Sequence, residues 1–190
     1  MSKLTQDELN RMLRAHALWR AGNPKGRRID LRYRDLSGLS FAGADCTYAL
    51  LTDANLANTN FAGTNCTRAN FTGADLTCTD FTGTNCTRAN FTGADLTCTD
   101  FTGANFTGAE LIRANFTNAT FTGADFTNAW CSPRDAHHIG YMGDRDVYLH
   151  NTLNVAGVIS LSRTYIRLNP TDVTPAEREY LQLLAATFAG

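Results

Sequence analysis

Two cysteines with flanking aspartates are the residues of this sequence whose type and spacing best suit chemistry. Cys78 and Cys98 are twenty residues apart, and each has an aspartate three residues before it and another two residues after it. These aspartates are Asp75, Asp80, Asp95 and Asp100. Carboxylates near a thiol raise its pKa and oppose its ionisation, so a nucleophilic role is disfavoured. A polar surface is the main interpretation, and capture of a soft metal ion is the alternative.

A second group of reactive side chains follows further along the chain. It consists of Cys131, Asp135, His137, His138, Asp144, Asp146 and His150. The spacings HExxH, CxxC, GxSxG and the phosphate-binding loop do not occur in the sequence. A histidine pair in a connector that contains glycines is more often a solvated loop than a reaction centre. We therefore expect no catalytic, cofactor-binding or metal-binding residues, and no cofactor.

The cysteine pair lies within a sequence repeat. Residues 64–83, TNCTRANFTGADLTCTDFTG, recur without a change as residues 84–103. Each copy has a five-residue rhythm of a small residue, Asn or Asp, a large apolar residue, usually Thr, and a variable residue that is often Gly. From Ile29 the rhythm continues without interruption, and its centres are all apolar or Cys, from Leu31 through Phe61 and Phe121 to Cys131. A five-residue unit cannot bury its own side chain, so the units must stack.

The pattern resembles the pentapeptide-repeat family, whose consensus is a small residue, Asn/Asp, Leu/Phe, Ser/Thr/Arg and a variable residue. The resemblance covers residues 29–133. It implies an all-β solenoid, a right-handed quadrilateral β-helix in which each pentad forms one side and four pentads form one coil. The central residue and the small residue two before it point inward, as their spacing on an extended segment requires. Twenty-one pentads then make about five coils and a rod roughly 25 Å long.

Residues twenty apart should therefore stack in columns. The predicted core ladder around the duplicated unit is Phe71, Leu76, Phe81, Cys86, Phe91, Leu96 and Phe101. The central Cys46, Cys66 and Cys86 form one inward column and act as small hydrophobic residues. Cys78 and Cys98 occupy the outward fifth position. Arg68 and Arg88 occupy the fifth position at the diagonally opposite corner, so these residues and the four aspartates form the candidate interaction surface.

Two further segments flank the repeats. A capping box from Thr5 to Glu8 predicts a helix to about Ala21, and residues 1–28 are expected to cap the N-terminal end. One face of this helix carries Leu9, Met12, Leu13, His16 and Trp19. Residues 134–190 contain two predicted strands, 147–153 and 155–168, and a second capping box before a helix to about Phe188. We interpret this segment as a small C-terminal β/α cap or a homodimerisation element.

Charge and hydropathy restrict the class of partner. The net charge is −1, so no bulk attraction to nucleic acid is expected. Residues 1–28 contain seven Lys/Arg against two Asp/Glu, whereas residues 29–133 contain five against ten. No apolar run matches a signal peptide or a membrane span. We expect a cytoplasmic protein with no membrane partner.

A solenoid with flat, regular sides lacks the concave site that an enzyme needs. The sequence therefore predicts a non-enzymatic rigid scaffold that presents charged faces to a protein partner. The resemblance implies an alternative, because some pentapeptide-repeat proteins bind type II topoisomerases as DNA mimics and inhibit gyrase or protect it from quinolones. The acidic repeat region favours this alternative. The short rod, the absence of an inserted loop and the many Asn residues in place of Asp favour the scaffold.

Overall fold

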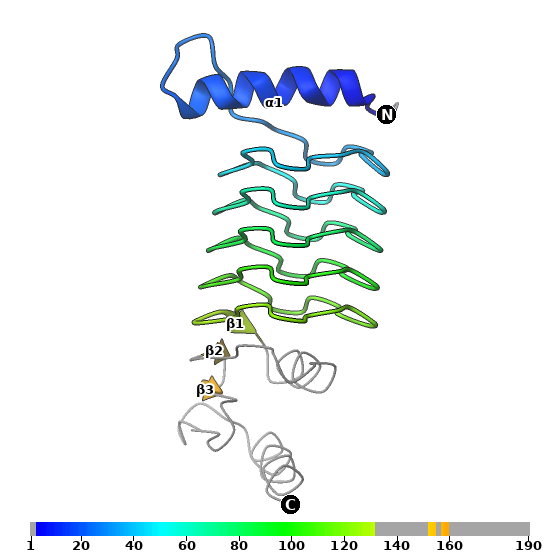
Figure 1. Cartoon of the computed structure of the whole chain (residues 1–190), viewed down its shortest axis with the longest axis vertical. Helices are drawn as coiled ribbons and strands as arrows, with labels where there is room; N and C mark the ends of the chain where they lie inside the picture. Colours follow the sequence, from blue (N-terminus) through cyan, green and yellow to red (C-terminus); the bar gives the residue numbers. More distant parts are fainter. Residues whose placement is uncertain (1–2, 132–151, 155–156, 160–190) are drawn as a thin grey trace, which may run out of the picture.

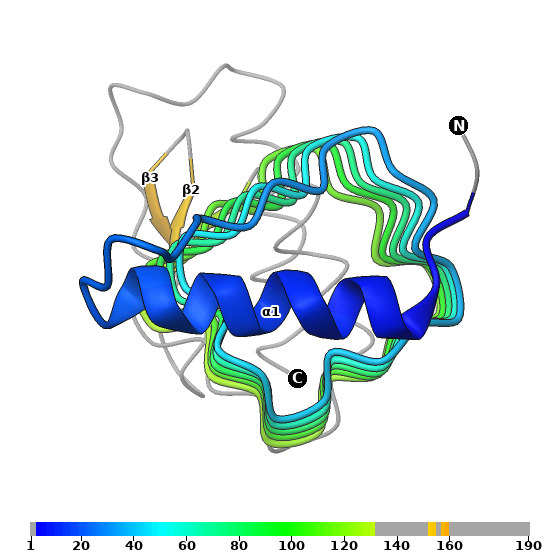
Figure 2. The same cartoon turned by 90° about the horizontal axis from the view of Figure 1, so that it is seen from above.

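A computed structural model shows a straight stack of coils beneath one helix, α1 (Gln6–Arg20) (Figure 1). The structure describes residues 3–131, 152–154 and 157–159. Parallel bridges join residues twenty apart, from Asp30 and Leu50 at the start of the repeats to Glu110 and Trp130 at their end. Viewed from above, the coils superpose around the rod axis (Figure 2). Four pentads therefore form one coil, as predicted.

Each side of a coil consists of one bridging residue and a turn. The bridging residue is the one that precedes the centre, usually Asn or Asp, and the turn follows the centre. In a representative turn, the backbone N–H of Thr64 donates to the carbonyl of Phe61 at 2.9 Å. Within the described residues, strands of two residues or more occur only as β1 (Trp130–Cys131), β2 (Thr152–Asn154) and β3 (Gly157–Ile159). Each side is joined to its neighbouring coils by several backbone hydrogen bonds around one bridging residue, such as Leu56 N–H to the carbonyl of Asp75 at 2.7 Å and Asn58 N–H to that of Thr77 at 2.9 Å.

The fifth residue of each pentad adopts a left-handed backbone conformation. From Tyr33 to Asn128, every fifth position has a φ between 52° and 70°. Glycine enters this region without steric cost, whereas other residues pay about 1–2 kcal/mol. This explains why glycine recurs at that position, a cause that the sequence pattern alone did not reveal. The exposed cysteines and arginines of the candidate surface all occupy such positions.

The centres of the pentads fill the interior. All seven residues of the predicted core ladder, from Phe71 to Phe101, are fully buried. The rings of Phe71 and Phe91 stack with their centroids 4.7 Å apart. Cys46, Cys66 and Cys86 are buried free thiols, and burial raises the pKa of Cys66 well above its usual value. The inward assignment of these columns is confirmed.

From Ala49 onward the small residue before each bridge is also buried, whereas Ala44 in the first coil is half-buried. Alanine suits this buried position because its side chain has no polar group. Threonine suits it because its hydroxyl donates a hydrogen bond to a carbonyl, as Thr64 and Thr84 do to the coil above. Thr64 Oγ1 donates to the carbonyl of Phe41 at 2.8 Å, and Thr84 Oγ1 donates to that of Phe61 at 2.7 Å. These bonds satisfy buried hydroxyls that would otherwise destabilise the core.

Helix α1 lies across the open end of the first coil (Figures 1 and 2). It begins at the predicted capping box, in which the N–H of Glu8 donates to Thr5 Oγ1 and the N–H of Thr5 donates to Glu8 Oε2. Leu9 and His16 are fully buried on its inner face. The predicted helix and its packed face are confirmed.

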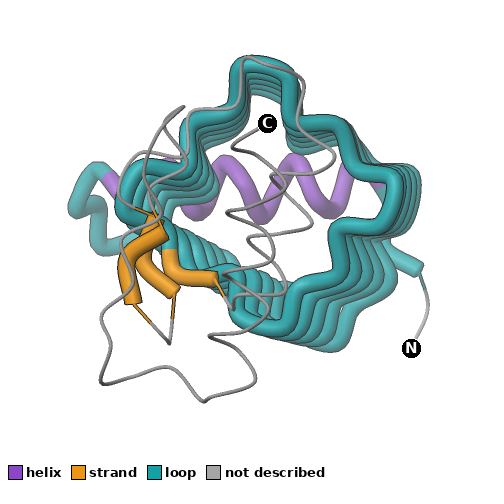
Figure 3. The backbone as a smooth tube through the Cα atoms, turned by 90° about the horizontal axis from the view of Figure 1, so that it is seen from below, coloured by secondary structure: helices purple, strands orange, loops and turns teal. Residues whose placement is uncertain are grey.

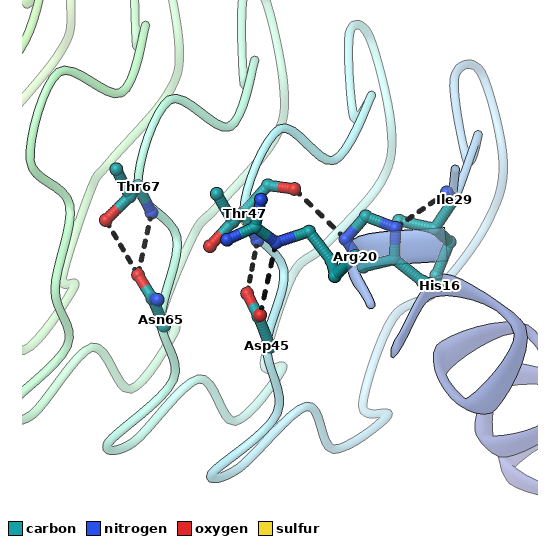
Figure 4. Close-up of polar contacts among 7 residues, drawn as sticks. All are labelled: His16, Arg20, Ile29, Asp45, Thr47, Asn65 and Thr67. Atoms are coloured by element: carbon teal, nitrogen blue, oxygen red, sulfur yellow. Dashed lines mark hydrogen bonds and ion pairs between the residues drawn. The ribbon is translucent and has the colours of Figure 1, made fainter. Parts of the chain in front are cut away.

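The N-terminal segment also supplies hydrogen bonds that a preceding coil would make. The side-chain amide of Gln6 donates to the carbonyl of Ser40 at 2.9 Å and accepts from its N–H at 2.8 Å. His16 Nδ1 accepts from the N–H of Ile29 at 3.1 Å, so Nε2 carries the proton and donates to the carbonyl of Thr47 at 3.0 Å (Figure 4). The open backbone edge of the first coil is thereby occupied.

Two short strands continue the sheet beyond the last coil. Strand β1 pairs with β2 in parallel, and β2 pairs with β3 in antiparallel orientation (Figure 3). They fall at the end of the first predicted strand run and within the second. The predicted C-terminal helix and the group of histidines and aspartates between residues 135 and 150 lie outside the described residues, so their predictions stay untested.

Candidate interaction surface

The acidic corner consists of Asp75, Asp80, Asp95 and Asp100 with Cys78 and Cys98. Parallel bridges pair Asp75 with Asp95, and Asp80 with Asp100. The two pairs lie on successive sides of the coil, and the cysteines occupy the corner between those sides. Asp80 is half-buried and the other five residues are exposed. The structure therefore places the acidic half of the predicted surface as the column rule requires.

The carboxylates of this corner also hold the local backbone. Oδ1 of Asp75 accepts from the N–H of Thr77 at 3.0 Å and from its hydroxyl at 2.6 Å. Asn65 makes the same pair of bonds to Thr67, at 3.1 and 2.7 Å (Figure 4). Asparagine and aspartate thus perform the same structural task at this position. The negative charge of the acidic corner is not required by the fold.

The two thiols of the acidic corner are free. The pKa of Cys78 is raised above its usual value, chiefly by desolvation, then by the neighbouring Cys98, and least by Asp75. The carboxylate effect expected from the sequence is present, because Asp75 raises the pKa of Cys78, but it is the smallest of these causes. The consequence is unchanged, because a protonated thiol is a poor nucleophile.

The basic corner lies diagonally opposite and consists of Arg68 and Arg88, which are both exposed. Arg68 Nη1 donates to the hydroxyl of Tyr48 at 2.6 Å, and its guanidinium carbon lies 5.6 Å from the centroid of that ring. Tyr48 occupies the same corner one coil earlier. The guanidinium of Arg20, which belongs to α1, lies 5.8 Å from the same ring. Two cations therefore stack on one tyrosine.

The basic corner continues into the N-terminal segment, a feature that sequence analysis missed. Arg28 Nε donates to the carbonyl of Tyr48 at 2.6 Å. Arg20 forms an ion pair with Asp45 at 3.3 Å (Figure 4). The sequence contains a sign of this continuation, because the twenty-residue spacing of the columns also joins Arg28, Tyr48, Arg68 and Arg88. Treating residues 1–28 as separate from the repeats concealed it.

The repeat, its twenty-residue coil and its buried centres together decide the family. The family described as pentapeptide repeats matches the chain in eight copies, over residues 49–85, 84–123 and 99–130. The chain belongs to the pentapeptide-repeat family. Its fold is accordingly a right-handed β-helix solenoid. A search of curated protein sequences finds no match.

Three solved structures similar to this pentapeptide-repeat protein illustrate the range of the fold. A pentapeptide repeat protein from the thylakoid lumen of Arabidopsis thaliana is 30% identical, with 62% of this chain and 79% of that chain covered and a TM-score of 0.44. HetL from Nostoc sp. strain PCC 7120, involved in heterocyst differentiation regulation, is 25% identical, with coverages of 75% and 72% and a TM-score of 0.34. QnrB1, a plasmid-mediated fluoroquinolone resistance protein, is 17% identical, with coverages of 85% and 90% and a TM-score of 0.35. At these TM-scores, none of the three assigns a function or a partner.

Within the described ranges, no three His, Cys, Asp or Glu side chains gather as a metal site. In that part of the chain, no helix has the length and apolar character needed to cross a bilayer. Among the described residues, the charged surface features are the acidic corner and the extended basic corner.

Proposed function

We propose that this protein is a non-enzymatic rigid scaffold that binds a protein partner mainly through its acidic corner. The observation that carries the proposal is the structural equivalence of aspartate and asparagine at the bridging position. Asp75 and Asn65 make the same bonds, yet the four bridging positions that flank the acidic corner are all aspartate, whereas the other four in residues 64–103 are all asparagine. Charge that the fold does not need is available for recognition.

The scaffold in this proposal has about five coils, with α1 as its N-terminal cap and residues 134–190 as a C-terminal cap. Each coil is fixed to its neighbours by backbone bonds such as Phe71 N–H to the carbonyl of Asn90 at 2.7 Å. A surface on such a framework is ordered before it meets a partner. Binding then avoids much of the entropy cost of arranging loops and side chains.

Charge alone would not hold the complex together. Exposed ion pairs contribute about 0.2–1 kcal/mol each, so four carboxylates orient a partner more than they retain it. Most of the affinity would come from contact with the flat sides between the corners. We therefore expect an association rate that falls as salt is added, because complementary charges steer the encounter.

A DNA-mimicking binder of a type II topoisomerase is the second candidate, and the acidic corner is the observation that favours it. Four carboxylates in two coils correspond to about one charge per 2.4 Å of rod, near the value of about one per 1.7 Å for duplex DNA. The repeat region as a whole has only five more acidic than basic residues. That is about one net charge per 5 Å, so the imitation is confined to one edge.

A neutral variant tests the proposal without disturbing the fold. Asp75, Asp80, Asp95 and Asp100 are each changed to Asn, which keeps the bond to the threonine two residues later. Partners captured from lysate of the source cells are quantified for the natural protein, for this variant and for a matched Arg68→Gln/Arg88→Gln control. The captured candidate partner is then purified, and its direct binding to each of the three proteins is measured. We expect the asparagine variant to lose the partner and the control to keep it.

Equal partner binding by the natural protein and the asparagine variant would contradict the proposal. The same two proteins are added at micromolar concentration to a gyrase supercoiling assay, with and without a quinolone. Inhibition or protection that disappears in the asparagine variant would select the topoisomerase candidate. Neither effect in the natural protein would exclude that candidate and leave the scaffold.

A further inference from the structure

The two cysteines of the acidic corner are held in parallel by the backbone. Cys78 and Cys98 have nearly the same φ, 54° and 58°. The N–H of Cys78 donates to the carbonyl of Thr97 at 2.9 Å, and the N–H of Cys98 donates to that of Thr117 at 2.9 Å. Each cysteine is thus fixed to the coil below by the same bond. Their side chains leave the rod from the same corner, one coil apart.

The distance between the two coils decides what these thiols can do together. Around them, rings one coil apart have centroids separated by 4.9 Å for Phe61 and Phe81, 4.7 Å for Phe71 and Phe91, and 5.4 Å for the tilted pair Phe81 and Phe101. These values are at or above the usual spacing of about 4.8 Å between paired backbones. A disulfide needs Cβ atoms about 3.5–4.5 Å apart, with a mean near 3.8 Å. Closing one would require parallel Cβ atoms at that spacing to approach each other by about 0.3–1 Å, against the ladder of backbone bonds.

A single ion between the sulfur atoms needs no such movement. Zn–thiolate bonds are about 2.3 Å long, and at a similar bond length a linear S–metal–S unit spans about 4.6 Å. Thiolates select soft ions such as Cu(I), and linear two-coordination is a common geometry for such monovalent ions. Zn²⁺ in a structural site requires four ligands. The spacing and the ligand number therefore indicate the same class of ion.

We propose that Cys78 and Cys98 form a two-coordinate site for a soft monovalent ion of the Cu(I) type, which bridges two coils at the acidic corner. On binding, each S–H bond breaks, each sulfur forms one bond to the ion, and two protons leave to solvent. No electron is transferred. Ion binding therefore tightens as pH rises. The carboxylates of the corner attract the cation, while their bonds to Thr77 and Thr97 keep them in place.

The chain contains its own comparison for this site. Cys46, Cys66 and Cys86 are also stacked one coil apart, but they are fully buried in the core. An ion could reach them only by opening the stack. Accessibility therefore separates the corner pair from the interior column, although both have the same vertical spacing.

The test is an anaerobic titration of the fully reduced protein with Cu(I), in competition with the chelator bicinchoninate. We expect one ion per chain and an X-ray absorption spectrum with two sulfur neighbours. Cys78→Ser and Cys98→Ser should each weaken binding by more than about 100-fold, since even the loss of an outer-shell partner costs about 10–100-fold. Cys66→Ala and Cys131→Ser are the matched controls, and both should keep the same stoichiometry and affinity.

The proposal would be overturned if the natural protein retained no ion against the chelator, or if the two serine variants bound the ion as tightly as the natural protein does. A third sulfur ligand in the spectrum would also overturn it. So would loss of ion binding in either control variant whose thermal melt is unchanged. A parallel arm treats the apoprotein with glutathione disulfide. Ready formation of a Cys78–Cys98 disulfide, seen as a two-proton mass loss, would contradict the spacing argument.

Discussion

Residues 64–83 and 84–103 have the same sequence but different surroundings, and the structure separates what each determines. Inside the rod the two copies behave alike, because Thr64 and Thr84 bond to the coil above with nearly equal lengths of 2.8 and 2.7 Å. At the surface they differ. Arg68 stacks on Tyr48, whereas Arg88 has Arg68 one coil above it. A coil's own sequence fixes its interior, and the neighbouring coil fixes the environment of its exposed side chains.

The largest expected effect is on the interior, where the two copies should respond equally. Phe81→Ala and Phe101→Ala should each reduce the free energy of unfolding by about 3–5 kcal/mol. Both rings are fully buried, although the Phe61–Phe81 pair is stacked at 7° and the Phe81–Phe101 pair is tilted at 38°. Urea denaturation measures both. A difference above about 2 kcal/mol, outside the usual context dependence of such substitutions, would mean that the copies are not equivalent inside.

The first coil differs from the two copies because its N-terminal neighbour is helix α1 and not another coil. His16→Ala should destabilise the protein by about 2–4 kcal/mol, since two buried backbone groups lose their partners. His16→Gln should cost less, because an amide can retain one of the two bonds. Equal stability of His16→Ala and the natural protein would show that α1 is dispensable to the first coil. Thermal melts at pH 7.5 measure these differences.

The same histidine predicts a dependence of stability on pH. Burial lowers the pKa of His16. The Thr47 carbonyl and Asp45 oppose this by smaller amounts, and the charged groups Arg20 and Arg28 lower the pKa slightly further. The unfolded chain therefore binds a proton at a higher pH than the folded chain does. Stability from His16 is complete above about pH 6.5 and falls as the pH drops below that value. Melts between pH 7.5 and 5 should show this fall, and His16→Gln should reduce it.

A smaller effect should separate the two copies at the surface. Arg88→Gly should stabilise the protein by about 1 kcal/mol, since the residue has a φ of 56° and glycine removes that strain. Arg68→Gly relieves the same strain but loses the stacking on Tyr48, which contributes about 0.5–1 kcal/mol. Its net effect should be near zero. Equal gains in the two variants would show that the Tyr48 contact contributes nothing.

The smallest effect is expected at the acidic corner. Asp80→Asn and Asp100→Asn should each change stability by no more than about 0.5 kcal/mol, because asparagine accepts the same bond from the threonine two residues later. The backbone bonds concerned are those from Thr82 and Thr102, at 2.8 and 2.9 Å. Calorimetry can resolve the difference. A loss above 1.5 kcal/mol in either variant would show that the charge supports the fold.

The interior of the coils could be predicted from the sequence because its rule is local. Every fifth residue is apolar, so Phe71 and its counterparts can be assigned inward without knowing the partner. Three residues at the small position do not follow the repeat, and their environment depends on α1, which the repeat does not specify: Ile29, Arg34 and Leu39. They occur in the first coil, over which α1 lies, and there Ile29 is buried and Leu39 is packed against the core.

The candidate surface was predictable in position but not in its contacts. The column rule placed Asp75 on Asp95 and Cys78 near Cys98. It could not show that the pKa of Cys78 depends more on desolvation than on carboxylates, because desolvation depends on the packed shape around the thiol. The continuation of the basic corner through Tyr48 to Arg28 required the path of the chain between α1 and the first coil.

The twenty-residue coil also makes the direction of a side chain depend on residue count. Duplicating a whole coil lengthens the rod and leaves every downstream residue at its original corner. Inserting a single pentad would instead rotate all later residues by a quarter turn about the rod axis. Inserting two pentads would move a later aspartate from the acidic corner to the corner that now carries arginine. Growth by whole coils is thus the change in length that preserves which residues share an edge, and the duplication at residues 64–103 is a change of that kind.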